Sequence, residues 1–313
     1  MKIISVIVPC FNEEESLGIF YKTTLECISK ISNYNFEFVF VDDGSTDNTL
    51  AILEELSKKD SRILYFSFSR NFGKESAMYA GLKNASGDFA VFMDADLQDP
   101  PSLLPEMINA IENEGYDCVA TRRVERKGEP VIRSFFARRF YKLINKISDI
   151  EIMDGARDFR LMTRQVVDSI LELTEYHRFS KGIFDWIGYK TKWIDYQNLE
   201  RVAGTTKWSF WKLFKYAIEG IVAFTTMPLK VASFFGMIIS LISFISLVFV
   251  VVRRLIFGDP VGGWASIVSI LLAVSGIQLI CVGVMGEYLS KTYMETKRRP
   301  LYFIKSTNKK ARK

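Results

Sequence analysis

Four oxygen-bearing side chains lie close together in a short segment that reads Phe92-Met-Asp-Ala-Asp-Leu-Gln-Asp-Pro-Pro101. They are Asp94, Asp96, Gln98 and Asp99. The two prolines stop the strand expected before them, so these side chains fall on a loop. Clustered carboxylates repel one another unless a cation lies among them, and Mg²⁺ or Mn²⁺ prefers oxygen ligands while keeping positions open for phosphate oxygens. The segment therefore predicts a divalent-metal site, with a solvated acidic turn as the alternative.

A second acidic pair, Asp42 and Asp43, begins the segment that continues Gly-Ser-Thr-Asp47. Adjacent side chains at the end of a strand point in different directions, so one can face a ligand while the other braces the loop. We expect Asp43 to accept a hydrogen bond from a nucleobase N–H. Gly44 permits a tight turn there. The alternative is that residues 42–47 form only a turn and a helix cap.

The elements that must position these carboxylates follow an α/β pattern. From Met1 to about Lys192, short β-branched or aromatic runs alternate with helical patterns, which predicts a mostly parallel sheet. The expected strands are Ile3–Val8, Phe36–Val41, Ile63–Phe68, Phe89–Met93 and Cys118–Thr121. The expected helices are Glu14–Ser29, Asn48–Lys58, Lys74–Lys83 and Pro101–Asn113. Since such sheets bind ligands beyond the carboxyl ends of their strands, the acidic residues after the strands are candidates for one site.

Composition and charge exclude several classes of protein. A hydrophobic content of 49% in 313 residues excludes a disordered chain. The net charge of +5 is uneven, because residues 288–313 contain nine Lys or Arg and one acid. A basic segment after an apolar helix favours anionic lipid headgroups over nucleic acid as its partner. The four cysteines show no paired spacing, which agrees with a reducing compartment.

Two uncharged apolar stretches, at 231–252 and 265–286, argue against a purely soluble protein. Each is about 22 residues long, and a helix needs about 20 such residues to cross a bilayer. The basic residues after 286 outweigh Arg253 and Arg254 in the connecting loop, so we expect both termini in the cytoplasm. The predicted domains are a cytoplasmic catalytic domain at 1–207, an amphipathic interfacial segment at 208–228, two transmembrane helices within 229–286 and a basic cytoplasmic tail at 287–313.

Two amphipathic stretches carry aromatic residues beside basic ones, at Arg133–Ile147 and Trp208–Phe224. We expect them to lie on an anionic bilayer surface. The alternative is that both are ordinary helices packed on the sheet.

Four motifs in chain order resemble those of family 2 glycosyltransferases, which have the Rossmann-like GT-A fold. They read Val6-Ile-Val-Pro-Cys-Phe-Asn-Glu-Glu14, Val41-Asp-Asp-Gly-Ser-Thr-Asp47, Ser69-Arg-Asn-Phe-Gly-Lys74 and Met93-Asp-Ala-Asp-Leu-Gln-Asp-Pro100. The closer similarity is to polyprenyl-phosphate glycosyltransferases, which include dolichol-phosphate mannose synthase and the bacterial bactoprenol glucosyltransferases. The resemblance covers nearly the whole chain, including the two C-terminal spans. It is specific to the family and not to one sugar.

The resemblance implies a role for each matching residue. The nucleotide sugar would bind Pro9, Glu13, Asp42, Asp43 and Asp94. The metal, Mg²⁺ or Mn²⁺, would bind Asp94, Asp96 and Gln98. The catalytic residues would be Asp96 and Asp158, although Asp158 has the alternative of a simple ion pair with Arg157 or Arg160. The acceptor phosphate would bind Arg122, Arg133 and Lys207.

The implied reaction is inverting transfer of one sugar from a nucleotide sugar, UDP-glucose or another UDP-hexose, to polyprenyl (undecaprenyl) phosphate. Its product would serve cell-envelope glycosylation at a bacterial inner membrane, and a separate flippase would act downstream. The chain lacks the Gln-X-X-Arg-Trp motif of processive relatives, which argues for one sugar per lipid. A lipid phosphate is largely dianionic at neutral pH, because its second pKa is about 6, so the attack needs no strong general base.

Two other classes of function compete with the enzyme. One is a catalytically silent membrane scaffold or lipid-binding subunit with the same fold, against which the intact acidic residues argue. The other is a small flippase or channel, against which the uncharged spans and the large preceding domain argue. A homo-oligomer is left open.

Overall fold

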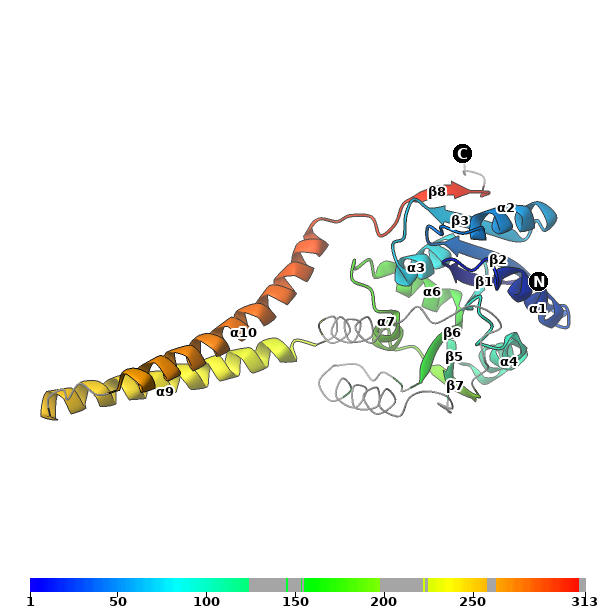
Figure 1. Ribbon diagram of the computed structural model, residues 1–313. Coiled ribbons are helices and arrows are strands. Elements are labelled where there is room, and N and C mark those ends of the chain that lie inside the picture. The colour runs from blue at the N-terminus through cyan, green and yellow to red at the C-terminus, as the bar shows by residue number, and fades with distance from the viewer. Residues whose placement is uncertain are drawn as a thin grey trace.

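The computed structural model describes residues 1–123, 145, 153, 155–197, 222, 225–257 and 263–309. In this part of the chain, one mixed sheet carries the strands in the order β7-β5-β6-β4-β1-β2-β3-β8 (Figure 1). The strands are β1 (Lys2–Cys10), β2 (Tyr34–Asp42), β3 (Ile63–Phe68), β4 (Phe89–Phe92), β5 (Cys118–Arg123), β6 (Ala156–Thr163), β7 (Thr191–Tyr196) and β8 (Ile304–Thr307). Neighbours are parallel except at the β4–β6, β5–β6 and β3–β8 pairs.

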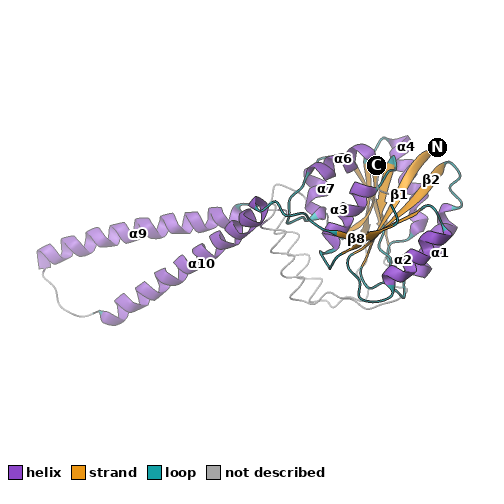
Figure 2. Cartoon of the chain, turned by 90° about the horizontal axis from the view of Figure 1, so that it is seen from above, coloured by secondary structure: helices purple, strands orange, loops and turns teal. Residues whose placement is uncertain are grey.

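Helices cover both faces of this sheet (Figure 2). One core lies between the sheet and α1 (Leu17–Ile28), α2 (Thr49–Lys59) and α4 (Leu104–Glu114), which follows the short helix η1 (Pro101–Leu103). The other core lies between the sheet and α3 (Lys74–Asn84), α6 (Arg164–Glu172) and α7 (Ser180–Trp186). The central strands are therefore buried on both faces, which explains why β2 contains the uninterrupted apolar run Phe38-Val-Phe-Val41.

The expected α/β class with a mostly parallel sheet is confirmed. All five expected strands and all four expected helices are present, with ends that shift by a few residues. Strands β6, β7 and β8 were not predicted. β7 and β8 are the two edge strands of the sheet, and β6 lies between β5 and β4. β6 and β8 pair antiparallel to their neighbours, so neither belongs to the repeating strand–helix pattern.

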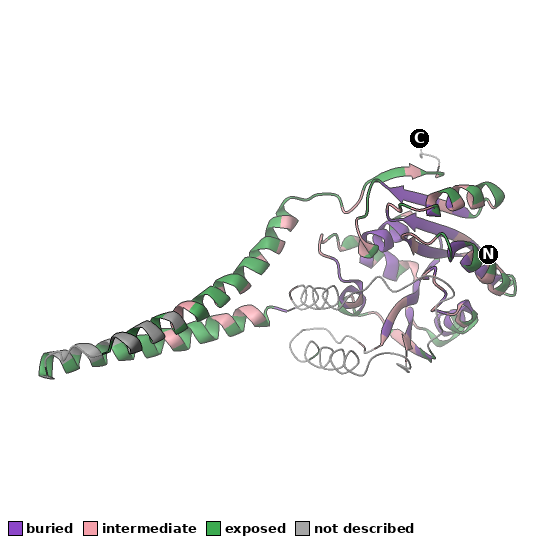
Figure 3. Cartoon of the chain, in the orientation of Figure 1, coloured by how far each residue is buried: buried purple, intermediate pink, exposed green. Residues whose placement is uncertain are grey.

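Two long helices follow the sheet domain, α9 (Met227–Phe257) and α10 (Trp264–Thr296), and they run side by side (Figure 1). By length and composition, both could cross a membrane, over Met227–Ser246 and Ala273–Thr296. Their apolar side chains are largely exposed (Figure 3), as for Phe234 (61%) and Leu279 (71%). A long apolar surface of this kind requires a partner, and lipid is a suitable one. Both helices extend beyond the predicted spans because polar residues at a helix end do not interrupt backbone hydrogen bonding.

Several predictions concern parts of the chain outside the described residues. They include Arg133 and Lys207, nearly all of the amphipathic stretch Arg133–Ile147 and all but one residue of Trp208–Phe224. These predictions stand as they were made.

Candidate active site

The predicted acidic residues gather at one edge of the sheet because their strands end together. Asp42, the last residue of β2, pairs with Cys10, the last residue of β1. On the other side of β1, Phe92 of β4 pairs with Ile7, so the loop that begins at Met93 leaves the sheet at the same edge. The residues after β1, β2 and β4 therefore meet there, as the pattern of parallel strands predicted.

Lys74, the first residue of α3, joins two of these carboxylates. Its Nζ lies 2.8 Å from Oδ1 of Asp94 and 2.6 Å from Oδ2 of Asp158. Asp158 comes from β6, the strand next to β4, which places its carboxylate beside the loop of Asp94. The result is a carboxylate–ammonium–carboxylate bridge across three elements.

The bridge keeps Lys74 and Asp158 in their charged forms. Burial alone would raise the pKa of Asp158, but the positive charge of Lys74, with those of Lys181 and Arg157, holds that pKa well below its usual range. Burial alone would likewise lower the pKa of Lys74, but Asp158 and Asp94 raise that pKa above its usual value. Both groups are therefore ionised at neutral pH, and a carboxylate with so low a pKa is a poor general base.

A second cation, Arg157, binds two residues of the loop that carries Asp94, namely Gln98 and Asp99. Its Nε lies 3.1 Å from Oδ1 of the buried Asp99, and its Nη2 lies 3.4 Å from Oε1 of Gln98. The hydroxyl of Tyr196 also donates to Asp99. Burial raises the pKa of Asp99, and the charge of Arg157 counters part of that rise. Asp99 thus holds the loop in place through Arg157 and Tyr196.

These ion pairs change the interpretation of the acidic cluster. A metal ion was the counter-charge expected from the sequence, whereas Lys74 and Arg157 already balance Asp94 and Asp99. The alternative in which Asp158 pairs with Arg157 or Arg160 is also replaced: Asp158 pairs with Lys74. The buried Arg160 lies over the ring of Phe184, 4.2 Å from its centroid.

The predicted metal ligands are suited to a divalent ion, although they do not form a closed cage. Asp94, Asp96 and Gln98 are partly exposed on one loop, and the backbone N–H of Gln98 donates to Oδ1 of Asp96. Among the described residues, no group of three or more His, Cys, Asp or Glu side chains is arranged to hold a metal. Mg²⁺ commonly binds through one or two carboxylates, with waters and substrate phosphates completing its shell. The donor set therefore fits an ion that arrives with a diphosphate.

Asp42 and Asp43 both brace loops. Asp42 accepts hydrogen bonds from the hydroxyl of Ser67 (2.6 Å) and the backbone N–H of Ser45 (3.0 Å). Asp43 accepts from the backbone N–H groups of Phe72 (2.6 Å) and Gly73 (2.9 Å). Burial raises the pKa of Asp43 to about 6, and these amides counter part of that rise. A carboxylate has about four acceptor positions, so Asp43 retains capacity for a nucleobase N–H.

Pro9 and Glu13 lie at the same edge, at the end of β1 and in the turn before α1. The backbone N–H of Glu13 donates to the hydroxyl of Thr49 (2.8 Å), and its carboxylate accepts from the hydroxyl of Ser16 (2.6 Å). The turn is therefore tied to the start of α2, beside Asp42.

Arg122, the predicted phosphate ligand, is the residue before the last in β5, and β6 and β4 separate β5 from β1 in the sheet. Its Nε and Nη2 lie 2.7 and 2.8 Å from the two carboxylate oxygens of Asp195 on β7. To bind Arg122, an acceptor phosphate would have to share its guanidinium with Asp195 or take the place of Asp195. Its proposed companions Arg133 and Lys207 lie outside the described residues.

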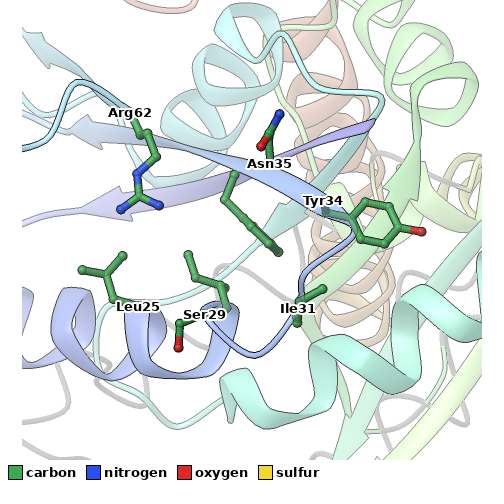
Figure 4. A pocket seen from close by; sticks show the side chains of 8 residues that line it. Leu25, Ser29, Ile31, Tyr34, Asn35 and Arg62 are labelled. Carbon is green, nitrogen blue, oxygen red and sulfur yellow. The ribbon is translucent and has the colours of Figure 1, made fainter. Parts of the chain in front are cut away.

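A cavity among the described residues lies away from this edge. It has a volume of about 480 Å³ and is lined by residues that include Leu25, Ile31, Tyr34 and Arg62 (Figure 4). Since Tyr34 begins β2 and Asp42 ends it, the cavity and the acidic residues lie at opposite ends of the strand.

Sequence reasoning missed Lys74, and it missed the neighbouring Glu75. Lys74 closes the motif Ser69–Lys74, which was recognised without assigning this residue a role. Glu75 is 105 residues from its partner Ser180, whose backbone N–H and hydroxyl both donate to its carboxylate. Glu75 thereby caps the start of α7 and connects α3 to it. The only sequence feature that pointed to either residue was the position of Lys74 at the end of the motif Ser69–Lys74. Nothing in the sequence pattern pointed to Glu75.

Glu75 leads to a prediction about pH. Burial raises the pKa of Glu75 to about 7, above its usual 4.5, so the folded state retains a proton that the unfolded state has lost. Its contribution to stability is full below about pH 4.5 and is lost as the pH rises through about 7. We expect the apparent Tm of the detergent-solubilised protein to fall between pH 5 and 8 by about 5 °C more than that of Glu75→Gln.

Thermal unfolding at pH 5, 6, 7 and 8 measures this difference. Glu55→Gln is the matched control, because Glu55 is 66% exposed and pairs only at the surface with Lys59. Parallel pH profiles for the wild type and Glu75→Gln would contradict the prediction.

The family model and the sequence relatives indicate the same type of protein. Residues 5–171 match the family described as glycosyl transferase family 2. The chain is 43% identical to a prophage bactoprenol glucosyl transferase homolog of Escherichia coli (strain K12), over 98% of this chain and 99% of that protein. It is also 43% identical to a bactoprenol glucosyl transferase of Shigella phage SfV, over 98% and 99%. A crystal structure of glucosyl-3-phosphoglycerate synthase from Mycobacterium tuberculosis is similar with a TM-score of 0.46 at 20% identity, over 71% of this chain and 78% of that chain.

Proposed function

Because this chain belongs to glycosyl transferase family 2 and is therefore a glycosyltransferase, we propose that it transfers one sugar from a nucleotide sugar to a polyprenyl phosphate. The proposed donor is UDP-glucose or another UDP-hexose, and the anomeric configuration would be inverted. The observation that carries the proposal is the ion-pair bridge of Asp94, Lys74 and Asp158 at one edge of the sheet, in a chain that continues into two long apolar helices. The names of the relatives support the polyprenyl acceptor.

The low pKa of Asp158 supports a charge-stabilising role. A polyprenyl phosphate is largely dianionic at neutral pH and needs no base to remove a proton before it attacks. Asp158 is held ionised by Lys74, so its negative charge can stabilise the positive charge that develops on the sugar ring, or orient a sugar hydroxyl. Lys74 keeps that carboxylate in position from the side of Asp94.

The nucleotide would lie over the ends of β1 and β2. Pro9, Glu13 and Asp43 would contact the nucleoside, and Asp94, Asp96 and Gln98 would hold Mg²⁺ or Mn²⁺ at the diphosphate. A bound divalent ion supplies Lewis-acid stabilisation of the negative charge on a leaving diphosphate. Arg122, Arg133 and Lys207 are the proposed residues for the acceptor phosphate, and Arg122 would exchange Asp195 for it.

The C-terminal strand supports the proposed topology. Strand β8 follows α10 and pairs with β3, in the same sheet as β1. If α9 and α10 cross a membrane, the chain must therefore return to the side on which the sheet lies. The basic residues after 286 favour the cytoplasm for that side, where nucleotide sugars are available.

Transfer of label from nucleotide sugars to lipid tests the proposal. Inverted inner-membrane vesicles containing the protein and undecaprenyl phosphate would receive a panel of labelled nucleotide sugars. We expect one UDP-hexose to label the lipid extract, with the anomeric configuration inverted in the product. Sealed right-side-out vesicles should give no label, because the donor cannot cross the bilayer, and vesicles with Asp158→Asn serve as the inactive control.

Two results would contradict the proposal. Binding of UDP without transfer from any donor would favour a catalytically silent scaffold. Labelling only in right-side-out vesicles would place the active site on the outer side of the membrane.

A further inference from the structure

We infer that the segment Tyr302–Asn308, which follows the second apolar helix, is a positioning element for the active site. It holds the loop Ser69–Lys74 from outside, so that this loop presents its amides to Asp43 and its lysine to Asp94 and Asp158. The inference rests on the proposed function for its effect on catalysis. Its structural part, the support of the loop, can be tested without any activity.

The segment is joined to the sheet along its length. Strand β8 pairs antiparallel with β3, with Ser306 opposite Ser67 and Thr307 opposite Phe66. At its end, the side chain of Asn308 accepts from the backbone N–H of Tyr65 (2.9 Å) and donates to the carbonyl of Ile63 (2.8 Å). The amide of Asn308 thus continues the ladder beyond the strand, and the chain after α10 is anchored to the catalytic domain.

The same segment contacts the loop directly. The backbone N–H of Ser69 donates to the carbonyl of Phe303 (2.9 Å). The ring of Tyr302 stacks on Phe68, with centroids 4.8 Å apart, and the ring of Phe303 lies 6.2 Å from that of Phe72. Phe68 and Phe72 also meet edge to face at 5.8 Å. These four rings form one cluster where β3, the loop Ser69–Lys74 and the segment Tyr302–Asn308 meet.

The inner side of the loop faces the site. Phe72 and Gly73 donate their backbone N–H groups to Asp43, and the next residue, Lys74, bridges Asp94 and Asp158. The loop also packs closely on the turn after β2: a Cβ on Gly44, whose φ is +67°, would lie 2.4 Å from the carbonyl carbon of Arg70. The loop Ser69–Lys74 is therefore held between the segment Tyr302–Asn308 on one side and the carboxylates of Asp43, Asp94 and Asp158 on the other.

The end of α10 is connected to Glu75 indirectly, through the segment that precedes α7. The carboxylate of Glu295 accepts from the backbone N–H of Tyr176 (2.8 Å), shortly before α7 begins at Ser180. Ser180 in turn binds Glu75, the residue after Lys74. The chain that leaves the second apolar helix therefore reaches the start of α3 by two routes, one through Glu295 and one through β8.

Hydrogen–deuterium exchange of the solubilised full chain tests the inference independently of activity. In Phe303→Ala, and in Tyr302→Ala, we expect the amides of Phe72 and Gly73 to exchange about tenfold faster, because the local opening of the loop is easier. Lys305→Ala is the matched control, since its side chain is exposed on the same strand. Phe303→Tyr should restore slow exchange, because an aromatic ring is retained.

Kinetics supply the second measurement. We expect Phe303→Ala to raise KM for the nucleotide sugar about tenfold and to leave KM for the polyprenyl phosphate within twofold, because the loop braces Asp43 on the nucleotide side. Phe303 is 56% exposed, so this variant should keep the wild-type fold and circular dichroism spectrum.

Unchanged exchange at Phe72 and Gly73 in both variants would overturn the inference, whatever their activity. Equal increases in KM for both substrates would also overturn it, because a general loss of structure would explain them. If no nucleotide sugar serves as a donor for the wild type, the proposed function fails, while faster exchange of the loop would still support the positioning role.

Discussion

Replacing Asp158 by asparagine is expected to lower kcat by roughly 10²–10³-fold while leaving UDP affinity nearly unchanged. The substitution keeps the shape of the side chain and removes its charge. Oδ2 of Asp158 lies 2.6 Å from Nζ of Lys74, and the pKa of Asp158 is held low mainly by that ammonium, with Lys181 and Arg157. Without the carboxylate, three positive groups remain beside the position of a sugar that becomes positively charged as it reacts.

Steady-state turnover and calorimetric titration with UDP measure the two parts of this expectation. Asp168→Asn is the matched control, because Asp168 is 59% exposed and pairs with Arg164 one helical turn away on α6. Near-wild-type turnover in Asp158→Asn, with both substrates bound normally, would show that Asp158 has no part in the chemical step.

The bridge through Lys74 makes the expectation more specific. Lys74→Met should also lower kcat, because Asp158 then loses its nearest cation and its carboxylate is no longer fixed. The double variant should be little worse than either single one, since both substitutions break one interaction. Additive losses would mean that Lys74 and Asp158 act separately.

Chelation of divalent metal by excess EDTA is expected to abolish turnover, and Mg²⁺ or Mn²⁺ should restore it. Asp96→Ala should lower kcat/KM for the donor roughly 10³-fold even at high metal concentration. Lys74 and Arg157 balance Asp94 and Asp99, so these two cations are committed to the protein's own carboxylates. A nucleotide diphosphate adds further negative charge, which needs a cation that arrives with it.

Turnover and UDP affinity, each measured with and without metal, check this expectation. In the wild type, metal should tighten UDP binding, and in Asp96→Ala that effect should be lost. Glu106→Ala is the control, because Glu106 is an exposed acid in the first turn of α4, on the segment that follows the same loop. Full turnover in excess EDTA would show that the carboxylate loop serves the reaction without a metal ion.

Local patterns in the sequence were sufficient for much of the architecture. The five strands and four helices of the first half were predictable because apolar spacing within each segment reports which face it buries. The position of Asp42 and Asp94 at one edge followed from parallel strands, whose carboxyl ends meet. The two apolar helices were predictable from length and composition alone.

Contacts between distant residues were decided only by the tertiary structure. Lys74 meets Asp158 across 84 positions, and Arg157 pairs with Asp99 although Asp158 is its neighbour in the chain. Both choices depend on distances of a few ångströms, which apolar spacing does not encode. Strand β8 is a four-residue segment in a basic tail, and it becomes a strand because β3 has an unpaired edge beside it. The sequence by itself therefore determined the elements of residues 1–123, the two apolar helices, the sheet edge and the acidic residues. The folded chain decided where β6, β7 and β8 lie, which charges meet at the edge and which segment holds them.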